Sequence, residues 1–127
     1  MDRIDLHVEV PRLELNDLKA EKKEESSQEI GKRITKARQR QLERFQGAAI
    51  NCNAEMQNHH LPRYCPLEKN TKELLYQAFH KLKLSMRALD RVVKIACTIA
   101  DLTGSTKIEQ IHLAEAIQYR CLDRSLW

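Results

Sequence analysis

Two arginine residues lie in segments whose patterns suit phosphate chemistry. Arg3 stands near the start of an alternating apolar and polar run, and Arg87 follows Ser85, a residue type that often caps a helix. The planar, permanently charged guanidinium of arginine can stabilise the negative charge that develops during phosphoryl transfer. In the first turn of a helix a cation gains nothing from the helix dipole, so a bound anion would explain the position of Arg87. The structural alternatives are that Arg3 pairs with a neighbouring aspartate and that Arg87 is a solvated charge.

Further cations follow Arg87 on the same predicted helix. Arg91 and Lys94 continue the helical face of Arg87. They could contact phosphate or a neighbouring subunit, although such a row is also typical of the solvated side of an amphipathic helix. Arg91 is therefore a second candidate for binding phosphate.

A basic stripe is predicted on an earlier helix. Its members recur at helical spacing and are Arg33, Lys36, Arg40 and Arg44. Cations arranged in this way can neutralise the phosphates of a nucleic-acid backbone. Aromatic residues are absent from the stripe apart from the adjacent Phe45, so a solubilising or inter-subunit face is the alternative.

Several kinds of chemistry are missing from the sequence. A phosphate loop of the form Gly-x-x-x-x-Gly-Lys-Ser/Thr is absent, because the pair Gly31-Lys32 is followed by Arg33 and lacks the upstream glycine. The spacing of Cys52, His59, His60 and Cys65 does not match a compact zinc motif, so we expect no metal site. Catalysis by these residues alone is not expected.

The 127 residues and their low content of glycine and proline, three of each, favour one small helical domain. The predicted helices begin at Ser26 or Ser27 and end at Gly47, run from about Asn70 to Leu82, extend from Ser85 to Gly104, and follow Ile108. A short helical stretch is expected over 53–59, and two prolines predict a loop over 61–67. The expected fold over 26–127 is an all-α small helical bundle.

The N-terminal segment has a different pattern. Over residues 4–10, apolar residues alternate with polar ones at period two and stop at Pro11, which predicts a half-buried strand. A single strand has no sheet to join, so we expect residues 1–11 to be loosely held. Residues 13–25 are dense in Glu and Lys and are interpreted as a linker. The predicted organisation is therefore a detached strand and linker over 1–25, followed by the helical domain.

Six ordered blocks together resemble the C-terminal region of magnesium-chelatase-related AAA+ ATPases, most closely the bacterial ComM/YifB type. The blocks are Asp2–Pro11, Glu25–Ser27, Ala37–Gln41, Leu84–Ala88, Ala96–Leu102 and His112–Arg120. The resemblance implies that residues 1–25 end an AAA+ core and that residues 26–127 form its C-terminal lid domain. It also implies that Arg3 is the arginine acting at a subunit interface and that Arg87 is the sensor-2 arginine, which contacts an ATP phosphate.

The resemblance implies a role within a larger ATPase. ATP and magnesium would act in the full-length parent, whereas tight binding to these residues alone is not expected. The implied partners are the missing AAA+ core, neighbouring subunits of a homo-oligomeric ring, and DNA, because ComM-type members are associated with branch migration in recombination and natural transformation. One alternative is a motor subunit of a true magnesium chelatase, which inserts magnesium into protoporphyrin. Another is a stand-alone helical interaction module.

The expected location is the bacterial cytoplasm. The longest apolar stretch, Val92 to Ala100, is interrupted by Lys94 and is shorter than the roughly 20 residues that span a bilayer. No secretory signal is recognisable. The four cysteines are irregularly spaced, which suits reduced thiols better than a disulfide framework.

Overall fold

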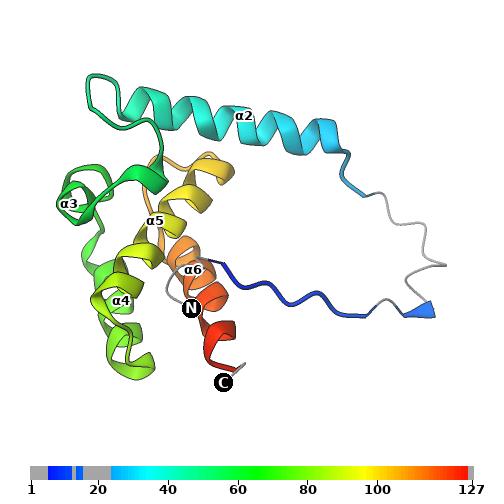
Figure 1. Ribbon diagram of the computed structural model, residues 1–127, viewed down its shortest axis with the longest axis vertical. Coiled ribbons are helices and arrows are strands. Elements are labelled where there is room, and N and C mark those ends of the chain that lie inside the picture. The colour runs from blue at the N-terminus through cyan, green and yellow to red at the C-terminus, as the bar shows by residue number, and fades with distance from the viewer. Residues whose placement is uncertain (1–5, 13, 16–23, 126–127) are drawn as a thin grey trace.

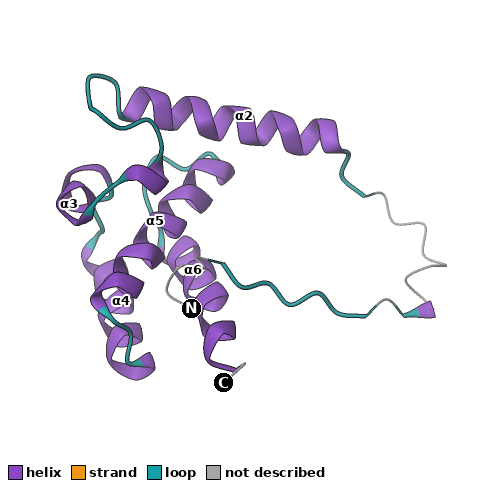
Figure 2. Ribbon diagram, viewed as in Figure 1, coloured by secondary structure: helices purple, strands orange, loops and turns teal. Residues whose placement is uncertain are grey.

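The computed structural model describes residues 6–12, 14–15 and 24–125, and the side chains of the last helix as far as Arg120. The elements are α2 (Ser27–Arg44), two 3-10 turns (Asn53–Glu55 and Asn58–His60), α3 (Leu61–Tyr64), α4 (Lys69–Leu82), α5 (Met86–Thr103) and α6 (Gln110–Ser125). Figure 2 shows helices and loops without a strand in the described part of the chain. The prediction of a small all-α bundle is confirmed.

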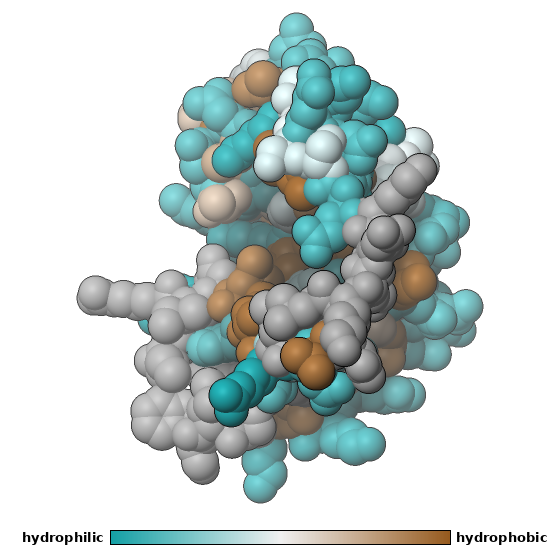
Figure 3. Space-filling model, turned by 90° about the vertical axis from the view of Figure 1, so that its right-hand side faces the viewer, coloured by the Kyte–Doolittle hydropathy of each residue, from teal (hydrophilic) through white to brown (hydrophobic). Residues whose placement is uncertain are grey.

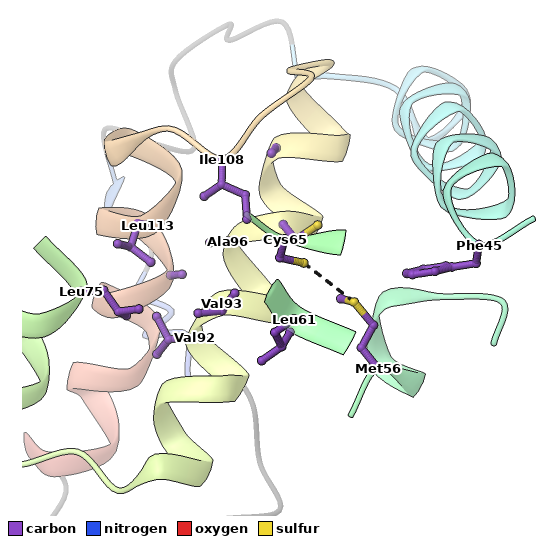
Figure 4. Close-up of a cluster of buried hydrophobic side chains, with 13 residues drawn as sticks. Phe45, Met56, Leu61, Cys65, Leu75, Val92, Val93, Ala96, Ile108 and Leu113 are labelled. Atoms are coloured by element: carbon purple, nitrogen blue, oxygen red, sulfur yellow. Dashed lines mark hydrogen bonds between the residues drawn. The ribbon is translucent and has the colours of Figure 1, made fainter. Parts of the chain in front are cut away.

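Helix α5 lies at the centre of the bundle. It packs against α6 and against α2, while α4 packs against α6 (Figure 1). The core contains Phe45, Met56, Leu61, Cys65, Leu75, Val92, Val93, Ala96, Cys97, Ala100, Ile108, Leu113 and Ala116. Figure 4 shows Leu61, Cys65, Ile108 and Leu113 around α5, and the Cys65 thiol lies 3.8 Å from the Met56 sulfur. Burial of this apolar surface is the main force that holds the helices together.

The ends of α5 are fixed by local sequence signals. The Ser85 hydroxyl accepts a hydrogen bond from the Ala88 amide at 3.1 Å and caps the first turn. Gly104 adopts a left-handed conformation with a φ of 81°, and the Ser105 amide donates to the Ala100 carbonyl at 2.9 Å. Glycine reaches this conformation without a steric penalty, so Gly104 ends the helix where the sequence predicts.

Two helix predictions differ from the structure. Helix α4 has Glu68 as its N-cap, not Asn70. Leu67, the residue before this cap, forms a parallel bridge with Ile108, so the chain is extended up to Glu68 and the helix begins directly after it. The loop expected over 61–67 contains the short helix α3, because proline is tolerated in the first turn, where its missing N–H has no helical partner.

The apolar face predicted for α2 is only partly buried. Ala37, Gln41 and Phe45 are buried, whereas Ile30 and Ile34 are 39% and 48% exposed. The N-terminal half of α2 projects beyond the bundle (Figure 1), so α5 covers only its C-terminal half.

The N-terminal segment is not a strand where it is described. The predicted strand covers residues 4–10, and residues 6–10 have no ladder partner, while residues 4 and 5 lie outside the described residues. Leu6, Val8 and Val10 are exposed. The alternation is present in the sequence, but the described chain offers no neighbouring strand to complete the hydrogen bonding. No described helix is long and apolar enough to cross a membrane.

Candidate functional site on helix α5

Arg87 lies in the first turn of α5, directly after the Ser85 cap. The capping bond and the bond from the Leu89 amide to the Ser85 carbonyl, at 3.0 Å, fix the backbone of this turn. The Arg87 side chain is exposed, and no ion pair or hydrogen bond from it is found among the described residues. An uncommitted arginine on a rigid helix end can bind an anion from solution or from another domain.

Arg91 and Lys94 follow Arg87 along α5 and are half-buried. Both line a groove of about 550 Å³ between α5, α6 and the N-terminal segment. The groove wall is otherwise largely apolar, with Ile95 and Ile99 from α5 and Tyr119 from α6. The structure therefore places Arg91 and Lys94 beside this largely apolar groove, whereas Arg87 is not among the residues that line it.

Charges next to the groove influence one another. Partial burial raises the pKa of Asp90, and the positive charge of Lys94 opposes this rise. On α6, the Tyr119 hydroxyl donates to the Glu115 carboxylate at 2.9 Å, and this bond raises the pKa of Tyr119. The groove thus contains both signs of charge, with the two cations on α5 and the carboxylate on α6.

Arg44, predicted to belong to the basic stripe, points into the protein. Its guanidinium forms a two-pronged ion pair with Asp101, with bonds of 3.0 and 2.5 Å, and donates to the Asn53 side chain at 3.0 Å. The Asp101 side chain is fully buried, whereas 23% of the Arg44 side chain is exposed. The hydrogen bond to Asp101 raises the pKa of Arg44 further above its ordinary value. Arg44 therefore ties α2 to α5.

The polar network around Asp101 satisfies its buried members. Asn53 donates to the Asp101 carboxylate at 2.9 Å and to the Thr98 hydroxyl at 3.1 Å. The backbone N–H of Asn53 donates to the side-chain oxygen of Gln41 at 3.0 Å. Buried polar groups are tolerated when they are hydrogen-bonded in this way, and the network fixes α2, the first 3-10 turn and α5 relative to one another.

The other members of the basic stripe, Arg33, Lys36 and Arg40, differ in how far they are exposed. Arg33 forms an exposed ion pair with Glu25 at 2.6 Å, and Lys36 is exposed. Arg40 is half-buried and donates to the Ser105 carbonyl at 3.2 Å. The structure thus leaves Arg33 and Lys36 on the open surface, whereas Arg40 and Arg44 bind the C-terminal end of α5. Arg3 lies outside the described residues, so its role stays a prediction.

Two of the three cysteines whose side chains are described belong to the core. Cys65 and Cys97 are buried, and Cys52 is half-buried. Interaction with Cys97, together with burial, raises the pKa of the Cys65 thiol. Within the described ranges, no group of three or more His, Cys, Asp or Glu side chains is placed to hold a metal ion.

Comparison of the sequence with known proteins identifies the class of domain to which the chain belongs. The sequence profile of the family described as "Magnesium chelatase, subunit ChlI C-terminal" matches residues 24–120, and the chain belongs to this family. Its relatives include "Competence protein ComM" from Haemophilus influenzae, which is 39% identical over 127 residues, 99% of this chain and 24% of that protein. "Uncharacterized protein YifB" is 35% identical in Salmonella typhimurium and 36% identical in Escherichia coli, again over 99% of this chain and 24% of each relative. The chain thus spans 24% of the length of these curated relatives.

Proposed function

We propose that this chain is the sensor-2 lid domain of a larger AAA+ ATPase and that Arg87 contacts a phosphate of ATP bound to the ATPase core. The observation that supports the proposal is the exposed, uncommitted side chain of Arg87 on the capped first turn of α5. The other end of α5 is fixed to α2 through Asp101 and Arg44. Movement of α5 that follows phosphate contact would therefore move α2 with it.

The residues present fit such a ligand only in part. Arg87 offers the planar fork that suits phosphate, and Arg91 stands one turn further along the same face. No phosphate loop is present in the sequence, so the remaining contacts to ATP and magnesium would come from the core and from neighbouring subunits of a ring. Bound ATP and magnesium would supply the phosphoryl group whose hydrolysis drives the motor. Arg3 is proposed as the arginine that reaches the neighbouring subunit's nucleotide.

The kind of work done by the motor is a separate part of the proposal. The name of the Haemophilus influenzae relative, a competence protein, favours a DNA-remodelling motor such as one that performs branch migration. Lys36 and Arg33 are the exposed members of the basic stripe, and Arg33 would have to exchange its exposed ion pair with Glu25 for a DNA phosphate. The family description favours the second candidate, a magnesium-chelatase motor acting on a tetrapyrrole.

ATP hydrolysis by the full-length protein, measured with and without branched or single-stranded DNA, distinguishes these two motors. The DNA-motor proposal predicts faster turnover with DNA and loss of most of that turnover in Arg87→Ala. Turnover that is indifferent to DNA would favour the chelatase candidate. An Arg87→Ala protein with wild-type turnover would refute the sensor-2 assignment in either motor.

A further inference from the structure

Three sulfur-bearing side chains lie together inside the bundle, at a place that the proposed function does not use. Hydrophobic residues are visible in the middle of the face shown in Figure 3, whereas Met56, Cys65 and Cys97 belong to the core and are 1%, 4% and 3% exposed. The Cys65 thiol donates to the Met56 sulfur at 3.8 Å (Figure 4). Cys65 directly follows α3 and Cys97 lies on α5, so the fold brings together two thiols that are far apart in the sequence.

Cys65 and Cys97 share the wall of one small hollow, which has a volume of about 80 Å³. About 10–15 Å³ of such space holds one water molecule, so a molecule as small as hydrogen peroxide has room beside the two thiols. The same hollow is lined by Pro66, Thr106 and Lys107, which are exposed residues. The hollow therefore connects the buried thiols with the surface.

The surroundings make the two thiols unequal. Interaction with Cys65 lowers the pKa of Cys97, burial opposes this effect, and the positive charge of Arg44 lowers the pKa again. Interaction with Cys97 and burial raise the pKa of Cys65, whose proton is donated to the Met56 sulfur. The thiolate is the nucleophile in thiol oxidation. Cys97 is therefore suited to attack an oxidant first, and Cys65 to react second.

The position of these thiols points to a site of oxidative modification. We infer that Cys65 and Cys97, which are free thiols in this structure, are converted to a disulfide by hydrogen peroxide. The Cys97 sulfur attacks one peroxide oxygen, the O–O bond breaks, and the hydroxide that leaves takes up the proton that Cys97 gave up. The Cys65 sulfur then attacks the sulfenic sulfur, the S–O bond breaks, and the second hydroxide takes the Cys65 proton. Two thiols are oxidised to one disulfide, and one peroxide is reduced to two waters.

The disulfide would join the end of α3 to α5 and enclose α4 in a covalent loop. Such a bond stabilises a fold mainly because it restricts the unfolded chain. Its product carries no charge, which suits a core better than a buried thiolate does. Oxidation should therefore make the helical domain harder to unfold.

Peptide mapping of the full-length protein after treatment with hydrogen peroxide, without nucleotide, tests this inference. Among Cys52, Cys65 and Cys97, the folded protein should form mainly the Cys65–Cys97 link, and dithiothreitol should release it. In the chain unfolded by denaturant, loop entropy favours the Cys52–Cys65 link over the Cys65–Cys97 link by about fourfold, because Cys52 is nearer to Cys65 in the sequence. Cys52→Ser is the matched control and should leave the yield of the Cys65–Cys97 link unchanged. In Cys65→Ser, a 1,3-diketone probe should trap sulfenic acid on Cys97.

Two results would overturn the inference. The first is a folded wild-type protein in which Cys52–Cys65 links outnumber Cys65–Cys97 links. The second is a protein that keeps Cys65 and Cys97 as free thiols after Cys52 has been oxidised. Mapping of the wild type needs no substitution, so the test does not depend on whether a variant folds. It is also independent of the nucleotide assignment: wild-type ATP turnover in Arg87→Ala would remove the sensor-2 role while leaving the Cys65–Cys97 link intact.

Discussion

Arg44→Met should destabilise the 127-residue chain strongly, although the sequence pattern places Arg44 on an exposed basic stripe that suits either nucleic acid or a solubilising or inter-subunit face. The substitution removes both bonds to Asp101. The Asp101 carboxylate, whose side chain is fully buried, then has no cation beside it. Breaking a buried ion pair on one side costs about 3–5 kcal/mol. Because 23% of the Arg44 side chain is exposed, solvent screens part of the attraction. We therefore expect the free energy of unfolding to fall by about 2–3 kcal/mol, which corresponds to a decrease of about 10–15 °C in Tm.

Chemical denaturation followed by helical circular dichroism measures this loss. Arg38→Met is the matched control: Arg38 is exposed on the same helix, and its replacement should change the free energy of unfolding by less than about 0.5 kcal/mol. Adding Asp101→Asn to Arg44→Met should recover part of the loss, because it removes the uncompensated buried charge. An Arg44→Met protein as stable as the control, or a double variant no more stable than Arg44→Met, would refute the reasoning.

The pH dependence of this contribution has a definite sign. The pKa of Arg44 is raised in the folded protein by its bond to Asp101. A cationic group whose pKa is higher in the folded protein stabilises the fold. This contribution is fully present below the pKa of the group in the unfolded chain, and it is lost only as the pH rises through the pKa in the folded protein. For arginine both pKa values lie far above neutral pH, so the difference in stability between wild type and Arg44→Met that is due to Arg44 should stay constant from about pH 6 to pH 9.

Three other predictions concern the packing and the thiols. Leu75→Ala should reduce the free energy of unfolding by about 2–5 kcal/mol, because Leu75 is buried in the core, and a loss below about 1 kcal/mol in denaturation would contradict its placement. Gly104→Ala should cost about 1 kcal/mol or more, since alanine is strained at a φ of 81°, and an unchanged Tm would contradict the helix end described here. A thiol reagent should modify the half-buried Cys52 before Cys65, as measured by mass spectrometry, because the interaction with Cys97 and burial raise the pKa of Cys65; faster labelling of Cys65 would be inconsistent with this environment.

The sequence predicts the features of the fold that depend on near neighbours. Ser26 and Ser85 cap their helices as expected, with hydroxyls that accept from amides three residues later. Gly104 ends α5 through its own conformation. These signals act over one helical turn, so a single sequence contains them completely. The overhang of α2 could not be predicted in this way, because the burial of Ile30 and Ile34 depends on where another helix ends.

For the candidate site too, the sequence predicts the positions that depend on near neighbours and not those that depend on distant ones. Arg87 could be placed at the start of α5 because the cap that positions it is two residues away. The fate of Arg44 depends on Asp101, 57 positions later, and on Asn53 in an irregular segment. The signals for this network were Gln41 on an otherwise apolar face and Asp101 within an apolar helix, but helical periodicity does not show which polar residues meet. A row of cations at regular spacing therefore contained both surface residues and a buried ion pair.

The affinity of the full-length protein for ATP, compared between wild type and Arg87→Ala, tests the central claim most directly. The account predicts that the substitution weakens binding of ATP by about tenfold or more, because a hydrogen bond to a charged group contributes about 1.5–3 kcal/mol. Helical circular dichroism should be unchanged, and Arg63→Ala, which removes an exposed arginine on α3, should bind ATP as the wild type does. Equal affinity and equal turnover in wild type and Arg87→Ala would contradict the assignment of Arg87 to an ATP phosphate.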